Sequence, residues 1–167
     1  MPAWGPDSAR VLIVGLAPGL HGAHRTGIPF FGDASGTLLL SALKESGFAT
    51  PEYPDGEPIR ITNVVKCLPP QNLPETGEVN RCQPFLEAEL AKLRAPEGII
   101  VCLGGVAHRA VLRALQQKLA GMPFGHGTRY VLKCGRQLVS SYHPSRLNIN
   151  TRRLTADGFH RLIRSLK

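Results

Sequence analysis

The stretch Arg10-Val11-Leu12-Ile13-Val14-Gly15-Leu16-Ala17-Pro18-Gly19 decides the fold of this chain. Its first half is apolar and β-branched, which predicts a short strand over residues 10–14 that is buried on both faces. Its second half is a turn built from glycine and proline. Such a pattern is typical of a parallel α/β sheet, and ligands bind to these sheets beyond the carboxyl ends of the strands.

The rest of the chain continues the alternation of strands and helices. Apolar and β-branched runs predict further strands over residues 59–65, 98–103 and 137–141, with a hairpin arm over 130–133. Apolar residues at helical spacing predict helices over 35–46, 79–93, 106–119 and 153–166. Right-handed crossovers between these units give a three-layer α/β/α fold around a central, mainly parallel sheet, which we expect to have four strands. The length favours a single domain over residues 1–167.

The composition points to a negatively charged partner. The chain carries a formal net charge of +8, and its last 25 residues hold +5 of this excess. A basic segment of this kind is either a solvated helix face or a surface that contacts phosphates. Because no apolar run is long enough to span a membrane and no secretory signal is present, we expect a cytoplasmic protein with no membrane partner.

Two loops carry residues that are suited to catalysis. The first continues from Gly19 through His24-Arg25-Thr26-Gly27-Ile28-Pro29-Phe30-Phe31-Gly32-Asp33, and the second is Ser141-Tyr142-His143-Pro144-Ser145-Arg146. One loop offers aromatic rings and a carboxylate, and the other offers a histidine in a rigid turn. Together these groups suit an enzyme that grips a flipped-out base.

The two loops, together with Lys66-Cys67-Leu68-Pro69-Pro70-Gln71-Asn72-Leu73-Pro74 and the downstream Cys82, resemble the motifs of the uracil-DNA glycosylase superfamily, in particular its family 5. The resemblance runs from about Pro6 to the C-terminus. It implies a monofunctional glycosylase of base excision repair that flips uracil, and potentially hypoxanthine or other deaminated bases, out of DNA and hydrolyses the N-glycosidic bond.

Cleavage of a glycosidic bond builds positive charge on the sugar and negative charge on the departing base, so the site needs a carboxylate and a hydrogen-bond donor. Asp33 and His143 fit these two roles. The resemblance assigns Asn72 to a supporting hydrogen bond with the water or the base. It also implies base binding by Phe30, or by its neighbour Phe31, and by the turn residues Gly15, Leu16 and Ala17.

Without their motifs, Phe30 would be read as a core aromatic and His143 as a loop histidine bonded to the backbone. The position of Leu16 carries an acid or amide in other branches of the superfamily. Because leucine cannot activate water, we expect that task to fall to another residue.

Several residues are expected to contact DNA. A rigid turn that carries Arg146 and Leu147 can enter the minor groove and fill the space that a flipped base leaves. The other expected contacts are Arg25, Ser145, Arg152 and Arg153. Arg152 stands where the family usually has glycine. The expected partner is double-stranded DNA that contains deaminated bases, bound by a monomer.

The cysteines depart from the family pattern. Families 4 and 5 hold a [4Fe-4S] cluster with four cysteines, of which Cys67 and Cys82 match one pair. No cysteine precedes Gly15, so the other pair is missing, either by loss or because the chosen start codon is wrong. Cys102 and Cys134 lie in an expected strand and hairpin, where a cysteine is most often a small apolar residue. Because a cluster needs four thiolates, we expect no cofactor in this chain.

Two other functions remain open at this stage. A chain that lacks half of its cluster ligands could be a lesion-binding module that retains the DNA groove and the wedge but lacks catalysis. A nucleotide-binding protein could use Gly15 to Gly19 to hold phosphate, although the turn matches neither of the common phosphate-binding glycine motifs.

Overall fold

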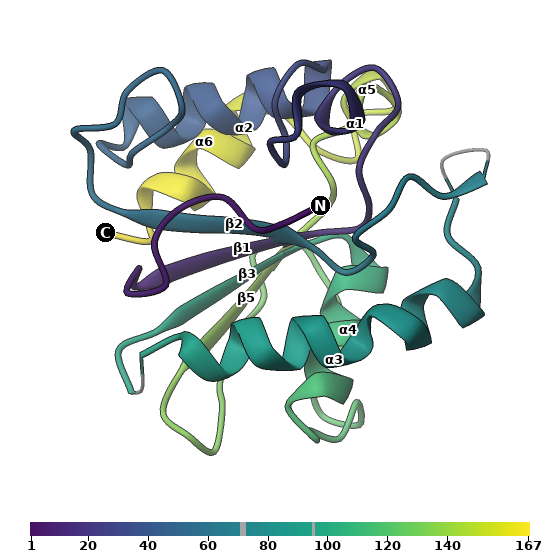
Figure 1. Cartoon of the computed structure of the whole chain (residues 1–167). Helices are drawn as coiled ribbons and strands as arrows, with labels where there is room; N and C mark the ends of the chain where they lie inside the picture. Colours follow the sequence, from purple (N-terminus) through teal and green to yellow (C-terminus); the bar gives the residue numbers. More distant parts are fainter. Residues whose placement is uncertain (71–72, 95) are drawn as a thin grey trace.

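The computed structural model describes residues 1–70, 73–94 and 96–167, and its centre is a twisted sheet (Figure 1). The sheet has the order β2-β1-β3-β5-β4. Its strands are β1 (Val11–Gly15), β2 (Ile59–Asn63), β3 (Ile99–Leu103), β4 (Arg129–Val131) and β5 (Gln137–Ser141). All neighbouring strands are parallel except β4, which pairs antiparallel with β5 at one edge.

Helices cover both faces of this sheet, which confirms the three-layer α/β/α fold. Helices α2 (Ala34–Glu45) and α6 (Ala156–Arg164) lie on one face, and α3 (Thr76–Lys92) and α4 (Gly105–Ala114) lie on the other (Figure 1). The short helices α1 (Ala23–Thr26) and α5 (Arg146–Asn150) lie at the end of the molecule where β1 leaves the sheet (Figure 1).

The expected number of four strands is wrong, because the described residues form a sheet of five. The hairpin arm that the sequence placed at residues 130–133 is β4, and it joins the sheet through Tyr130, which pairs with Leu138 of β5. Two of the three residues of β4 have exposed side chains. Such a short exposed segment lacks the continuous apolar run that identifies the four central strands.

The alternating side chains of the central strands feed two hydrophobic cores. Val11 and Ile13 of β1 pack with residues of α2 and α6, whereas Leu12 and Val14 pack with residues of α3 and α4. Every residue of β1 and β3 is buried. Burial on both sides fixes the register of these strands, so the turns at their carboxyl ends have defined positions.

Two predicted helices are shorter than expected. The helix predicted over 106–119 ends at Ala114, and Gln116 follows with a positive φ of 52°. The helix predicted over 153–166 begins only at Ala156, because Thr155 is its N-cap and its hydroxyl accepts a hydrogen bond from Gly158 N. Arg152, directly before that turn, has a positive φ of 56°.

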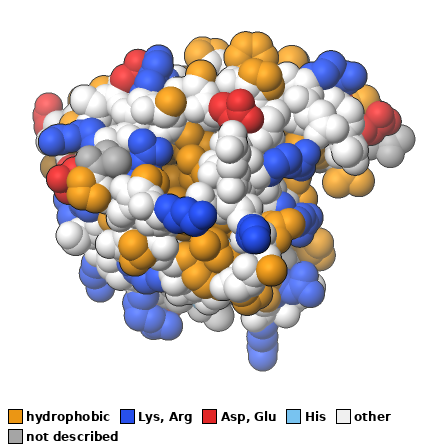
Figure 2. Space-filling model, turned by 90° about the horizontal axis from the view of Figure 1, so that it is seen from below, with side chains coloured by type: hydrophobic (Ala, Val, Ile, Leu, Met, Phe, Trp, Pro, Cys, Tyr) orange, Lys and Arg blue, Asp and Glu red, His pale blue; other side chains and the backbone are white. Residues whose placement is uncertain are grey.

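Lys and Arg side chains lie on the face of the molecule that is seen from below (Figure 2). Figure 2 shows the face below the view of Figure 1, where Lys and Arg side chains lie around exposed hydrophobic side chains. The excess charge is therefore not confined to the C-terminal segment. Within the described residues, no helix is long and apolar enough to cross a membrane.

Candidate active site

A pocket of about 200 Å³ lies where the turns after β1, β2 and β5 meet the N-terminus of α2. It is lined by Ala17, Gly19, Ala23, Phe30, Asp33, Ser35, Asn63 and His143. Four residues expected from the sequence, Ala17, Phe30, Asp33 and His143, thus lie at one place. The other expected site residues lie beside this pocket or elsewhere.

Gly15 and Leu16 lie beside the pocket. A Cβ atom at position 15 would lie 2.5 Å from the Phe30 ring and 2.4 Å from Asn63 Oδ1, so only glycine leaves room for these two side chains. Leu16 is half-buried, and its carbonyl oxygen accepts a hydrogen bond of 2.9 Å from Val65 N. It is not among the lining residues, so its contact with a base stays a prediction.

Phe30 is held in an unusual backbone conformation. Its φ is +56°, a value that residues other than glycine rarely adopt, and such strained conformations cluster at active sites. A Cβ atom at Gly36 would lie 2.0 Å from the Phe30 carbonyl oxygen, so the first turn of α2 can approach this backbone only because residue 36 is glycine. The ring of Phe30 is 6% exposed and stacks on His143, with ring centroids 5.6 Å apart.

Asp33 has a structural role as well as a place in the pocket. It is the N-cap of α2, and its Oδ1 accepts a hydrogen bond of 2.8 Å from Gly36 N. Asp33 Oδ2 faces two glycines, since a Cβ atom would lie 2.5 Å from it at Gly22 and 3.2 Å at Gly19. The helix therefore fixes one oxygen of the carboxylate, while glycines keep the space beside the other oxygen clear.

His143 is fixed through its backbone. Its carbonyl oxygen accepts hydrogen bonds of 2.8 Å from both Ser145 N and Asn148 Nδ2. Removal of the imidazole from water lowers the pKa of His143 below its usual value, and the negative charge of Asp33 opposes this shift in part. The ring is therefore neutral near neutral pH, with one N–H group available as a donor.

Asn63 is a buried polar residue of the pocket that the sequence analysis missed. It is the last residue of β2, lies opposite Gly15 in the sheet, and is only 4% exposed. Among the residues that the structure describes, its buried Oδ1 has no hydrogen-bond partner. A buried amide oxygen without a partner carries a free-energy cost, and a ligand in the pocket can remove that cost. The signal in the sequence was a polar residue at the carboxyl end of an apolar strand.

Asn72, the third expected catalytic residue, lies outside the described residues. Its role therefore stays a prediction.

The expected DNA-contacting residues cluster only in part. Ser145 is the N-cap of α5, and Arg146 and Leu147 follow it on the exposed side, with Leu147 71% exposed. Arg146 and Asp33 line a shared open hollow, which places α5 beside the pocket. Arg25 is exposed on α1.

The last two basic residues of the expected DNA contact, Arg152 and Arg153, follow α5, and Arg153 contacts Tyr142. Arg152 is exposed in the turn after α5. The guanidinium of Arg153 lies over the Tyr142 ring, 5.5 Å from its centroid. Both therefore lie close in the chain to the loop of His143.

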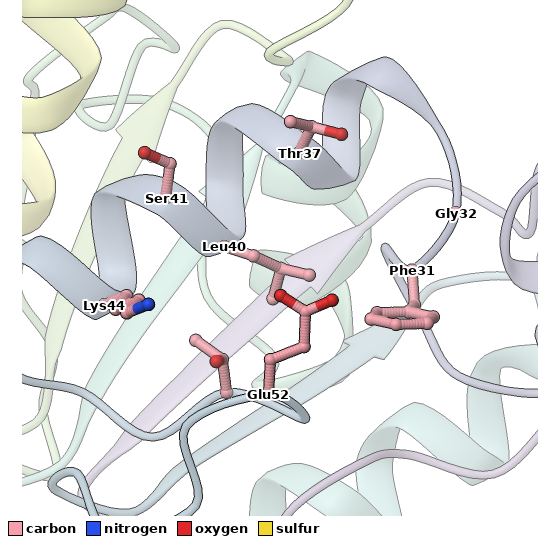
Figure 3. Close-up of a pocket in the computed structure, with 8 residues that line it drawn as sticks. Phe31, Gly32, Thr37, Leu40, Ser41, Lys44 and Glu52 are labelled. Carbon is pink, nitrogen blue, oxygen red and sulfur yellow. The ribbon is translucent and has the colours of Figure 1, made fainter.

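Phe31, the alternative to Phe30, lies outside the pocket of Asp33. It lines a separate hollow of about 390 Å³ along α2 and the following loop, in which Lys44 and Glu52 also lie (Figure 3). The structure therefore places Phe30, and not Phe31, against the candidate catalytic groups.

The cysteines do not fit a four-thiolate cluster. Cys67 is exposed, and Cys82 Sγ accepts a hydrogen bond of 3.4 Å from Lys66 N. Cys102 is buried within β3, where desolvation raises the pKa of its thiol, and Cys134 is exposed between β4 and β5. Across residues 1–70, 73–94 and 96–167, no group of three or more His, Cys, Asp or Glu side chains is placed to hold a metal ion.

Comparison with known proteins agrees with this geometry. Residues 2–167 match the model of the uracil DNA glycosylase superfamily. A type-5 uracil-DNA glycosylase of Thermus thermophilus is 41% identical over 174 residues, which covers 100% of this chain and 78% of the relative. A type-5 uracil-DNA glycosylase of Pyrobaculum aerophilum is 43% identical and covers 98% of this chain and 74% of its own length. A type-5 uracil-DNA glycosylase of Mycobacterium leprae is 41% identical, and the match covers 100% of this chain and 76% of the relative.

Proposed function

The chain belongs to the uracil-DNA glycosylase superfamily, and we propose from this that it is a monofunctional uracil-DNA glycosylase of base excision repair. It hydrolyses the N-glycosidic bond between uracil and deoxyribose in DNA. The observation that carries this proposal is one pocket that holds a carboxylate, a neutral histidine, a buried aromatic ring and an amide whose oxygen has no partner among the described residues.

The pocket offers a binding surface for a flipped pyrimidine. Phe30 supplies a ring on which the base stacks. Asn63 supplies an amide, which both accepts and donates hydrogen bonds, and uracil presents an N3–H donor beside a carbonyl acceptor. Oδ1 of Asn63 accepts from N3–H, so binding of uracil satisfies a buried polar atom that has no partner among the described residues.

The two charged products of bond cleavage have partners on this chain. As the bond to C1′ lengthens, the ionised carboxylate of Asp33 stabilises positive charge on the sugar and orients water. The neutral ring of His143 donates a hydrogen bond to a uracil carbonyl and stabilises the departing anion. Water then adds its hydroxyl to C1′, and its proton balances the charge of the released base.

The exposed side of α5 is suited to holding the DNA open. Leu147 is exposed and follows Arg146, which lines the hollow it shares with Asp33. Leu147 can fill the gap that the extruded base leaves, while Arg146 contacts the flanking phosphate. We assign Ser145, Arg25, Arg152 and Arg153 to further contacts with the backbone of the same duplex.

The finer features of the activity belong to the same proposal. Leu16 leaves the pocket edge apolar, which extends the substrates to hypoxanthine and other deaminated bases. Asn72 supports the water or the base. We further propose that the protein acts on double-stranded DNA as a cytoplasmic monomer and carries no resident cofactor.

An excision assay tests this function. The purified chain is incubated with end-labelled duplexes that differ only in uracil, hypoxanthine or thymine at one position, and alkali then cleaves the strand at abasic sites. We expect cleavage at uracil, weaker cleavage at hypoxanthine and none at thymine. Binding of the uracil duplex without any abasic site would overturn the enzymatic function and favour a lesion-binding module.

A further inference from the structure

A histidine outside the pocket, His126, contacts the end of the strand that carries His143. Its Nδ1 lies 3.0 Å from the hydroxyl oxygen of Ser141, the last residue of β5. Ser141 is fully buried, and its hydroxyl donates a hydrogen bond of 2.9 Å to the carbonyl oxygen of Tyr142. A chain of two hydrogen bonds therefore joins His126 to the peptide that precedes His143.

The direction of this chain follows from the number of protons. A carbonyl oxygen only accepts, so the single proton of the Ser141 hydroxyl is directed to Tyr142 O. The bond between His126 and Ser141 then requires His126 Nδ1–H as the donor. When His126 Nδ1–H donates to the Ser141 oxygen, the hydroxyl no longer rotates, and its hydrogen bond to the carbonyl oxygen of Tyr142 becomes stronger.

An aromatic contact holds the same segment from the other side. The rings of His126 and Tyr142 are nearly parallel, with an interplanar angle of 9° and centroids 6.3 Å apart. Phe124 packs edge-on against Tyr142, with centroids 5.5 Å apart. His126 thus contacts Tyr142 through its ring and, by way of Ser141, through the peptide.

We propose that His126 is a positioning residue for His143. The peptide between Tyr142 and His143 is fixed at Tyr142 O by the relay from His126, and the next carbonyl is fixed by Ser145 and Asn148. Together these bonds set the direction in which the imidazole enters the pocket. Small displacements of a catalytic group lower rates steeply, by about 100-fold for 1 Å.

The test separates the hydrogen bond from the aromatic contact. His126→Phe keeps a flat ring against Tyr142 and removes the donor, whereas His126→Asn keeps an N–H donor near the position of Nδ1. Since His126 is exposed, neither change removes much buried surface. His160→Phe serves as the matched control, because His160 pairs with Glu45 of α2 and takes no part in the relay.

For excision of uracil we expect His126→Phe to lower kcat about 10-fold with KM within a factor of about two, because the relay acts on His143 and not on DNA binding. His126→Asn recovers most of the rate. Ser141→Ala lowers kcat to the same extent, and His126→Phe adds little in that background because both changes break one relay. The control keeps the rate of the unaltered protein.

An unchanged kcat in His126→Phe or in Ser141→Ala, no recovery in His126→Asn, or additive losses in the double variant would each overturn the proposal. If His126→Phe does not fold, the kcat of Ser141→Ala alone tests the proposal, since this variant removes only one oxygen atom from the same relay. The inference rests on the proposed function. An unaltered protein that excises no uracil refutes that function, whereas an active protein with an equally active His126→Phe refutes only the relay.

Discussion

Asp33 caps a helix with one oxygen atom, and the proposed chemistry falls to the other. Its Oδ1 caps α2, and its Oδ2 faces the space that Gly19 and Gly22 leave open. A simple alanine substitution therefore mixes two effects, because loss of an N-cap alone costs about 0.5–2 kcal/mol of stability. Asparagine caps helices as well as aspartate does, but it carries no charge.

We accordingly predict that Asp33→Asn separates the two roles. The melting temperature stays close to that of the unaltered protein, because the amide oxygen still accepts from Gly36 N. The excision rate falls by about 100-fold or more, since the negative charge that faces the sugar cation is lost. Single-turnover excision and thermal melts measure the two effects, and undiminished excision would remove the Asp33 charge from the mechanism.

Asn63 gives a second prediction at the residue scale. Asn63→Leu is close in volume but offers no hydrogen bond, so uracil-containing DNA is expected to bind and react about 10- to 100-fold less well. The fold is expected to tolerate the change, because an apolar group replaces a buried oxygen that has no partner in the described part of the chain. Asn80→Ala is the control, since Asn80 pairs with Arg113 on the surface and lies outside the pocket lining. Equal kcat/KM in the two variants would contradict the base-reading role.

The sequence was sufficient to predict three side chains that the structure brings together in the pocket. Phe30, Asp33 and His143 lie in loops dense in glycine and proline, which mark unusual backbone conformations. Asn63 was missed because it stands within a strand, where a polar residue near the end of an apolar run has no distinctive local pattern. Its significance appears only when the parallel register places it opposite Gly15.

At the scale of elements, the turn between α5 and α6 is under strain. Arg152 adopts a φ of +56° there, and its amide N donates to Ile149 O. A left-handed conformation costs a residue with a Cβ atom about 1–2 kcal/mol, whereas glycine adopts it freely. The sequence pointed to this position, since the resemblance places glycine there.

Arg152→Gly is therefore expected to stabilise the protein by about 0.5–1 kcal/mol. This net gain is the strain that glycine relieves, reduced by the additional chain entropy that glycine loses on folding. Arg152→Ala serves as the control, because it removes the charge and keeps the Cβ atom. Urea unfolding measures both. A glycine variant no more stable than the alanine variant would show that the turn is unstrained.

Elements with a continuous apolar pattern were predicted closely, whereas the hairpin arm over 130–133 was predicted without its place in the sheet and the helix over 106–119 was predicted too long. The four central strands lie where the sequence placed them, because burial on both faces demands uninterrupted apolar runs. The edge strand β4 and the early end of α4 depend on pairing and packing with distant segments. One example is His108 of α4, whose ring bonds both Ser140 and Met122.

At the scale of the whole molecule, the net charge of +8 predicts salt-dependent binding to DNA. If Arg25, Arg146, Arg152 and Arg153 each neutralise one phosphate, the slope of log K against log salt is about −3.6 for duplex DNA. Arg146→Ala is expected to reduce this slope by about 0.9, and Arg113→Ala, far along α4, to leave it unchanged. Anisotropy titrations at several salt concentrations give the slopes. Equal slopes for both variants would place Arg146 off the DNA.

The most direct test of the whole account is a count of products in a single turnover. The protein, in excess over a duplex with one uracil, is quenched at intervals, and free uracil and abasic sites are both quantified by mass spectrometry. The account predicts one free uracil for each abasic site, with the strand intact before alkali and with both products suppressed together in Asp33→Asn. No released uracil from the unaltered protein, or equal release from Asp33→Asn, would contradict it.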